Sequence, residues 1–198
     1  DFLEEAYGKL RIIEEKQVGK SRADIVMVLP GLLTGIEIKS DADSYVRLSR
    51  QVKDYDRFFD RNMVVAGSSH AAHVREHVPG WWGIITVEQN DREIDFYVLR
   101  QPQENPMMNW KRKLSLLWRP ELAHIQELTA MPRYKEKSKA FVIEKILAKV
   151  PGEQLSVLVS EELFERDYTR IEEVIRAYKI QNRPELKGRT GKRKRRRP

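Results

Sequence analysis

The chain has 198 residues, of which 40% are hydrophobic and 34% charged, and its net charge is +7. This length suffices for a core shared by a sheet and several helices, which excludes a disulfide-stabilised miniprotein. The absence of cysteine excludes thiol nucleophiles, cysteine zinc sites and disulfides. No apolar run approaches the roughly 18 residues of a membrane span, and no signal-peptide pattern is visible. We therefore expect a soluble, cytoplasmic protein.

The positive charge is concentrated in two segments. Residues 105–150 and 187–198 carry net charges of +6 and +8, whereas residues 1–104 and 151–186 carry −4 and −3. Separate basic segments are typical of arms that hold a polyanion. A tail that only keeps the protein soluble would explain the terminal run equally well. We expect DNA as the partner, with RNA as the alternative, and no membrane partner.

The periodicity of apolar residues predicts alternating helices and strands over the first hundred residues. In chain order we expect a helix over 2–10, strands over 11–18, 23–29 and 33–40, a helix over 42–61, a strand over 63–66, a helix from Ser68 to about residue 78, and strands over 81–88 and 94–100.

Beyond residues 102–106 only helical patterns remain. The expected helices cover 110–117, 120–128, 139–150, 153–165 and 169–181. We therefore predict an α/β fold of the α+β kind with a mixed sheet. Its expected parts are a sheet domain over 1–104, a helical accessory region over 105–182 and a basic tail over 183–198.

Three charged residues on neighbouring strands are the candidate catalytic centre. Glu37 and Lys39 are two apart in a strand and therefore share a face. If the chain turns tightly at Pro30-Gly31, Asp24 lies opposite Glu37, about 5 Å away. Two adjacent carboxylates in apolar strands favour a bound divalent cation, either Mg²⁺ or Mn²⁺, and Lys39 could act on a water or on the transition state. The alternative is a surface hairpin with a simple ion pair.

The following predicted helix adds two polar residues to this candidate site. Gln51 and Tyr55 are four apart and therefore lie on one helical face, next to the hairpin. A core tyrosine with a polar neighbour would give the same pattern.

The order Asp24, Glu37-x-Lys39 and Gln51-x-x-x-Tyr55 along the chain resembles the motif of the PD-(D/E)XK phosphodiesterase superfamily, in the branch with a Gln-x-x-x-Tyr motif. The chain is further similar to an uncharacterised bacterial and phage family sometimes called sce-type. The likeness covers most of residues 3–165, and Ala23 replaces the usual proline before the first aspartate. It extends over these segments: Ser21-Arg22-Ala23-Asp24, Glu37-Ile38-Lys39-Ser40-Asp41, Arg47-Leu48, Gln51, Tyr55, Phe59-Asp60 and Pro79-Gly80-Trp81-Trp82-Gly83.

The resemblance implies a restriction-endonuclease-like core with a metal-dependent nuclease site. Asp24 and Glu37 would be metal ligands, together with Ile38 between the two charged residues of the strand. Lys39 would be the catalytic lysine, and Gln51 and Tyr55 accessory residues. Many members also place a glutamate of the first helix at the metal. Here that would be Glu5, with Glu4 or a residue before Asp1 as alternatives.

Basic residues of the helical region are the candidate contacts to nucleic acid. The segment 117–150 resembles the helix-extended-helix of SAP-type DNA-binding modules, and a solvated loop explains its charges equally well. The expected contacts are Arg133, Lys135, Lys137 and Lys139, and in the tail Lys192, Arg193, Lys194, Arg195, Arg196 and Arg197. We expect a metal-dependent DNA nuclease. The alternative is a catalytically silent nucleic-acid-binding or assembly protein with the same fold.

Overall fold

The computed structural model describes residues 2–89, 94–166 and 171–181. In this part of the chain six strands form one mixed sheet, and their order in the sheet follows their order in the sequence. The β3–β4 and β4–β5 pairs are parallel, and the other neighbouring pairs are antiparallel. The strands are β1 (Arg11–Val18), β2 (Ser21–Leu29), β3 (Leu32–Lys39), β4 (Arg61–Gly67), β5 (Gly83–Gln89) and β6 (Ile94–Arg100). The expected α+β fold with a mixed sheet is confirmed.

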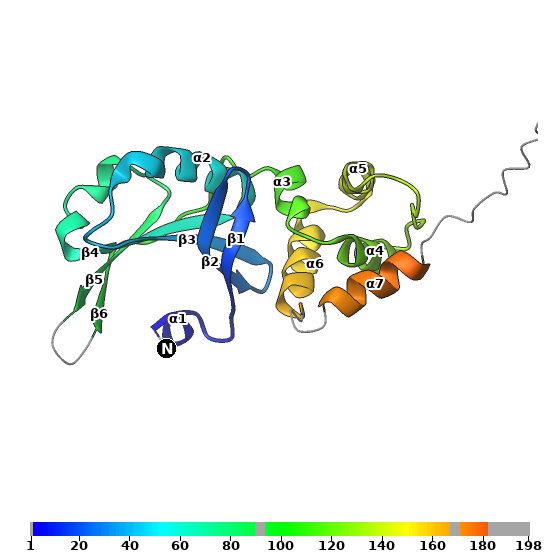
Figure 1. The fold of residues 1–198 in the computed structure, drawn as a ribbon, viewed down its shortest axis with the longest axis horizontal. Coiled ribbons are helices and arrows are strands. Elements are labelled where there is room, and N and C mark those ends of the chain that lie inside the picture. Colours follow the sequence, from blue (N-terminus) through cyan, green and yellow to red (C-terminus); the bar gives the residue numbers. More distant parts are fainter. Residues whose placement is uncertain (1, 90–93, 167–170, 182–198) are drawn as a thin grey trace, which may run out of the picture.

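Two helices cover opposite faces of the sheet (Figure 1). The helix α2 (Leu48–Phe58) packs on one face and buries Tyr55 and Phe58 in the main core. The short helix α1 (Phe2–Tyr7) packs on the other face, against a smaller cluster that includes Met27 and Ile36. The two faces of β3 therefore meet different helices, and Glu37 and Lys39 lie on the face that meets α2.

Three predicted helices differ from the structure. The helix expected over 2–10 ends at Tyr7, because Gly8 has φ +72°. The helix expected over 42–61 begins later, because the Asp43 carboxylate accepts hydrogen bonds from Ser40 and holds a turn after β3. The helix expected from Ser68 is wrong. Two 3₁₀ turns, η2 (Ser68–His70) and η3 (Val74–Glu76), replace it. The Tyr45 ring contacts the rings of His70 and His77 there, so tertiary packing decides the local conformation.

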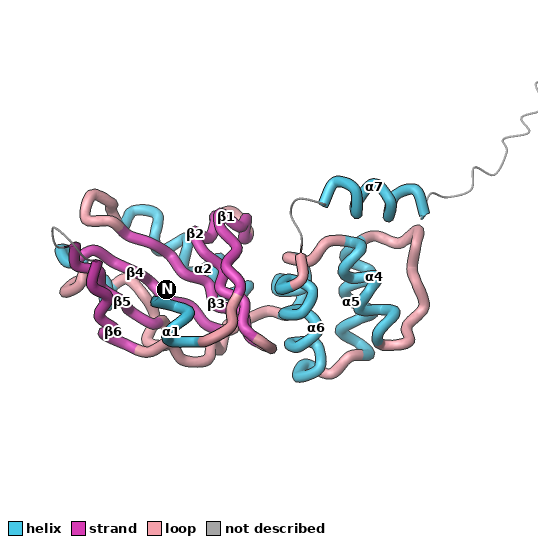
Figure 2. Tube along the Cα trace, turned by 90° about the horizontal axis from the view of Figure 1, so that it is seen from below, coloured by secondary structure: helices cyan, strands magenta, loops and turns pink. Residues whose placement is uncertain are grey.

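The second half of the described chain is helical, as expected, and packs against one end of the sheet (Figure 2). Its helices are α3 (Trp110–Ser115), α4 (Arg119–Leu128), α5 (Lys139–Lys149), α6 (Gly152–Phe164) and α7 (Ile171–Gln181). At the β2–β3 turn the Gly31 amide donates to Ser160 Oγ of α6 at 2.8 Å. One hydrophobic cluster runs from Ile13 to Leu163 and thus includes both halves. No helix among the described residues is long and apolar enough to cross a membrane.

Candidate active site

The β2–β3 hairpin places Asp24 opposite Glu37. Ile25 pairs with Ile36, and the same register continues to a two-residue turn at Pro30-Gly31. Gly31 has φ +72°, a conformation that favours glycine. The expected register is therefore confirmed, and the Ile38 amide donates to Asp24 Oδ2 at 2.8 Å.

Glu37 is the centre of a buried hydrogen-bond network. It is 1% exposed, and Lys39 is 4% exposed. The Lys39 ammonium donates to Glu37 Oε1 at 2.7 Å and to Gln51 Oε1 at 3.2 Å, while Gln51 Nε2 also donates to Glu37 Oε1. The Tyr55 hydroxyl donates to Glu37 Oε2 at 2.6 Å and accepts the Asp24 amide at 3.2 Å. The structure thus brings together all five predicted catalytic residues.

Burial dominates the electrostatics of this network. Desolvation raises the pKa of Glu37, hydrogen bonds from Lys39 and Tyr55 act against that rise, and the Asp24 charge adds to it. Desolvation and the Glu37 charge raise the pKa of Tyr55, so its hydroxyl stays protonated and remains a donor. The site therefore holds one buried pair, Glu37 and Lys39, which neutral side chains of α2 hold in place through hydrogen bonds.

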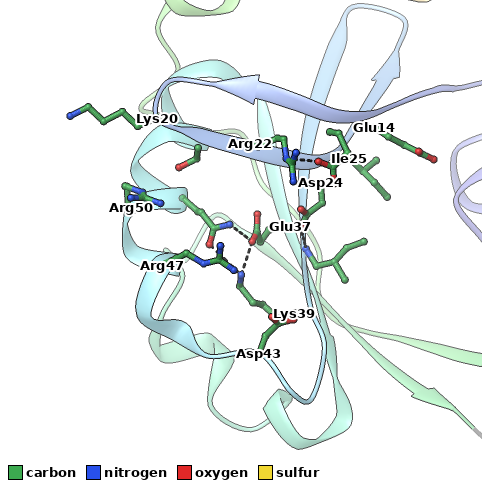
Figure 3. Close-up of a pocket in the computed structure, with 14 residues that line it drawn as sticks. Glu14, Lys20, Arg22, Asp24, Ile25, Glu37, Lys39, Asp43, Arg47 and Arg50 are labelled. Carbon is green, nitrogen blue, oxygen red and sulfur yellow. Dashed lines mark hydrogen bonds and ion pairs between the residues drawn. The ribbon is translucent and has the colours of Figure 1, made fainter.

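A pocket of about 660 Å³ lies above this network (Figure 3). Asp24, Glu37 and Lys39 line it together with basic residues of the β1–β2 turn, of β2, and of the first turn of α2 and the residue before it. These basic residues are Lys20, Arg22, Arg47 and Arg50. A basic rim of this kind attracts a phosphate ester, and neighbouring carboxylates are the ligand type that divalent cations prefer.

Two acidic residues of β1 also line the pocket and were not predicted. Glu14 and Glu15 lie on β1, where the pairing with β2 is interrupted opposite Asp24. Glu15 has φ +54°, which is unusual for a residue other than glycine. Glu15 also forms an ion pair with Arg22. No periodicity in the sequence signals this local change of direction, so the sequence could not reveal both glutamates.

The structure does not bring Glu5 to this pocket. The helix α1 lies on the face of the sheet that carries Ile36, and Glu4 lines an apolar pocket of about 420 Å³ there with Phe2 and Leu3. Among the described residues no group of three or more acidic or histidine side chains could hold a metal. Mg²⁺ commonly uses only one or two protein carboxylates, with water and substrate as its other ligands. The pair of Asp24 and Glu37 fits that requirement.

The predicted nucleic-acid contacts of the helical region lie away from this pocket, in the segment between α4 and α5 and, for Lys139, at the first residue of α5 (Figure 1). Arg133 forms an ion pair with Glu127, and the Lys139 ammonium donates to the Ser115 carbonyl at 2.7 Å. Lys137 lies over the Phe141 ring, and Lys135 is exposed. The tail residues named above, from Lys192 to Arg197, lie outside the described residues.

Comparisons with known proteins connect the sequence with phage proteins. The family model described as "Bacteriophage P4 protein cII" matches residues 2–183. Protein cII of Enterobacteria phage P4 is 28% identical over 101 residues, which are 51% of this chain and 38% of that protein. The chain thus spans well under half of the curated relative. Among solved structures, Pyrococcus furiosus SfsA in complex with Ca²⁺ has 17% identity, covers 52% of this chain and 58% of its own, and has a TM-score of 0.32.

Proposed function

This chain belongs to the bacteriophage P4 protein cII family, and from the geometry of its pocket we propose that it is a metal-dependent nuclease that hydrolyses phosphodiester bonds of DNA. We assign it to the PD-(D/E)XK type on the resemblance to that superfamily and its sce-type branch. The observation that supports this proposal is the convergence of Asp24, Glu37 and Lys39, with Gln51 and Tyr55 bonded to the same carboxylate.

In this proposal each residue has a separate role. Asp24 and Glu37 would hold Mg²⁺ or Mn²⁺, which supplies charge neutralisation at the phosphate and favours deprotonation of an adjacent water. Gln51 and Tyr55 fix the orientation of Glu37 by donating to its two oxygens. Lys39 orients the water or stabilises the negative charge that develops on the phosphate. Arg47 and Arg50 bind phosphates at the rim.

One observation favours a catalytically silent nucleic-acid-binding protein as the second candidate. Three protein donors already satisfy both oxygens of Glu37 without a cation. Within the described residues, by contrast, only Oδ2 of Asp24 accepts a hydrogen bond. The two candidates therefore differ in what Asp24 does, and its substitution separates them.

A cleavage assay with an Asp24 variant tests the proposal. The purified full chain should cleave duplex, single-stranded or branched DNA with Mg²⁺ or Mn²⁺ and should stop with EDTA. Asp24→Asn should reduce cleavage by at least about 100-fold, because it removes a ligand charge, while DNA affinity stays unchanged. Lys39→Ala should also stop turnover. The matched control Glu104→Gln removes an exposed carboxylate and should keep full activity.

Two outcomes of this assay would contradict the proposed nuclease mechanism. Cleavage that persists in Asp24→Asn comes from another source and contradicts the mechanism. DNA binding without any cleavage that Asp24→Asn removes, on every DNA form and on RNA, supports the silent binding protein.

A further inference from the structure

A second groove of about 450 Å³ adjoins the candidate active site. Lys20 and Arg50 line both the groove and the pocket, so the two cavities lie side by side. Lys53, Arg57 and Arg112 extend the lining away from Glu37. We call these five residues the cationic groove. Together with the basic rim of the pocket they form a track of positive charge that leads from the acidic centre to α3.

The spacing of residues in α2 explains this track. Arg50, Lys53 and Arg57 are three and four positions apart, so they share one side of the helix. All three side chains are exposed, whereas Leu48, Val52 and Tyr55 on the other side are buried. Lys20 comes from the β1–β2 turn and Arg112 from α3. Three separate elements thus direct cations to the same cavity.

The charges of the cationic groove are not neutralised inside the described part of the chain. Its five side chains form no ion pair with another described residue. Several basic side chains elsewhere do have acidic partners: Lys111 lies 2.9 Å from Glu144, Lys113 lies 2.7 Å from Asp60, and Arg133 pairs with Glu127. Neighbouring unpaired cations repel one another, and a bound polyanion removes that cost.

The acidic residue in the groove has a structural role that leaves these cations free. Asp54 Oδ2 accepts the Lys20 amide at 3.1 Å and the Ser21 hydroxyl at 2.7 Å. These bonds fix the β1–β2 turn against α2 and hold Lys20 beside Arg50. The backbone that carries Lys20 is therefore positioned before any ligand binds, which lowers the entropy cost of binding.

The groove offers charge but no surface for stacking bases. Phe58 is the aromatic residue among the described lining residues, and it is 5% exposed. Proteins that bind nucleic acids through their bases use exposed aromatic side chains or polar groups that reach base edges. Exposed lysine and arginine side chains instead contact phosphates.

We propose that the cationic groove binds the phosphate backbone of a nucleic acid on one side of the cleaved bond, independently of base sequence. This assignment rests on the proposed function, because that function places the cleaved bond in the adjoining pocket. It differs from the expected contacts in the helical region, which lie elsewhere in the fold.

DNA binding by the full chain in EDTA tests this assignment without cleavage. Fluorescence anisotropy with labelled duplexes of two unrelated sequences gives Kd as a function of salt. Arg50→Gln/Lys53→Gln/Arg57→Gln should weaken binding at least about tenfold at roughly 50 mM salt and lower the slope of log K against log salt by about 3. A second variant on other elements, Lys20→Gln/Arg112→Gln, should lower that slope by about 2.

The matched control removes the same charge elsewhere. Arg75→Gln/Arg176→Gln/Lys179→Gln changes three exposed cations outside the groove and should leave both Kd and slope nearly unchanged. Groove variants that behave like this control overturn the assignment. A difference in Kd above about tenfold between the two duplexes also overturns it, because specific contacts to a single base pair change affinity by about that factor. Either result would leave the proposed nuclease function intact, provided that cleavage still depends on Asp24. Conversely, loss of the proposed nuclease activity would leave binding in EDTA unaffected.

Discussion

At the scale of single residues, Glu37 is the buried charge on which the pocket depends. A carboxylate removed from water requires partners, and here Lys39, Gln51 and Tyr55 supply them. The Tyr55 hydroxyl also accepts the amide of Asp24, so one atom joins the two predicted metal ligands. Changes at Tyr55 should therefore affect both stability and catalysis.

Tyr55→Phe tests the role of that hydroxyl. The ring should still pack against Phe59 and Trp82, but Glu37 loses a donor and the Asp24 amide loses an acceptor. We expect the free energy of unfolding to fall by about 1–2 kcal/mol in urea denaturation. Tyr134→Phe is the control, because its hydroxyl has no hydrogen bond within the described residues, and it should change stability by less than about 0.5 kcal/mol. Equal effects of the two variants would show that the hydroxyl of Tyr55 contributes little.

The sequence was sufficient to predict the meeting of Asp24, Glu37 and Lys39, because strand alternation and a tight turn determine positions along a hairpin. The hydrogen bonds around Glu37 depend on how α2 packs on the sheet, which no local pattern specifies. The same limit applies to Glu5. The sequence predicts its helix, but the face of the sheet that this helix covers is decided by tertiary packing of Phe2 and Leu3.

At the scale of elements, the close approach of β3 and α2 positions the site. Gly35 makes this approach possible, because a Cβ at that position would lie 2.3 Å from Phe59 Cδ2 and 2.8 Å from Tyr55 Cδ1. Both rings belong to the core beside α2. The short separation between the strand with Glu37 and the helix with Gln51 therefore depends on the absence of a side chain at Gly35.

Gly35→Ala should push α2 away from β3. We expect a loss of stability of about 2–3 kcal/mol, measured by thermal or urea unfolding, and a parallel loss of DNA cleavage. Gly80→Ala is the matched control, since a Cβ there meets no atom within 4 Å, and it should be nearly neutral. A tolerated Gly35→Ala with full activity would mean that the two elements can separate without harm to the site.

The errors in the predicted elements have a common physical cause. Residues 68–78 have the composition of a helix, yet contacts of Tyr45 with His70 and His77 favour short turns. The strand predicted from residue 81 begins at Gly83, because the indole of Trp82 is buried and its Nε1 donates to Asp56 at 2.7 Å. In both places a long-range contact overrides a local preference.

At the scale of the whole molecule, charged residues lie where the helical half meets the sheet. Lys16 of β1 lies over the Trp118 ring at 5.8 Å, near Glu121, Lys139 and Arg166. Burial, followed by the positive charge of Arg166, lowers the pKa of Lys16 to about 8. Its protonated form is thus disfavoured in the folded state.

Stability should therefore depend on pH in a defined window. Between about pH 8 and the normal lysine value near 10.5, the unfolded chain binds more protons than the folded one, so stability rises with pH. Lys16→Met should flatten this rise and, allowing for solvent screening, stabilise the protein by about 1–2 kcal/mol at pH 7. Urea unfolding at pH 7 and 10 measures both effects. Lys135→Met, at an exposed position, should show neither.

The contact between the β2–β3 turn and α6 has a consequence for folding during translation. All strand neighbours in the sheet are consecutive in the sequence, so pairing can begin soon after each strand leaves the ribosome. Gly31, however, meets Ser160 across a separation of 129 residues. At about 5–20 residues per second, the hairpin that carries Asp24 and Glu37 waits roughly 6–26 s before its turn is covered. For that interval the growing chain exposes the apolar end of its own sheet, where chaperones have time to bind.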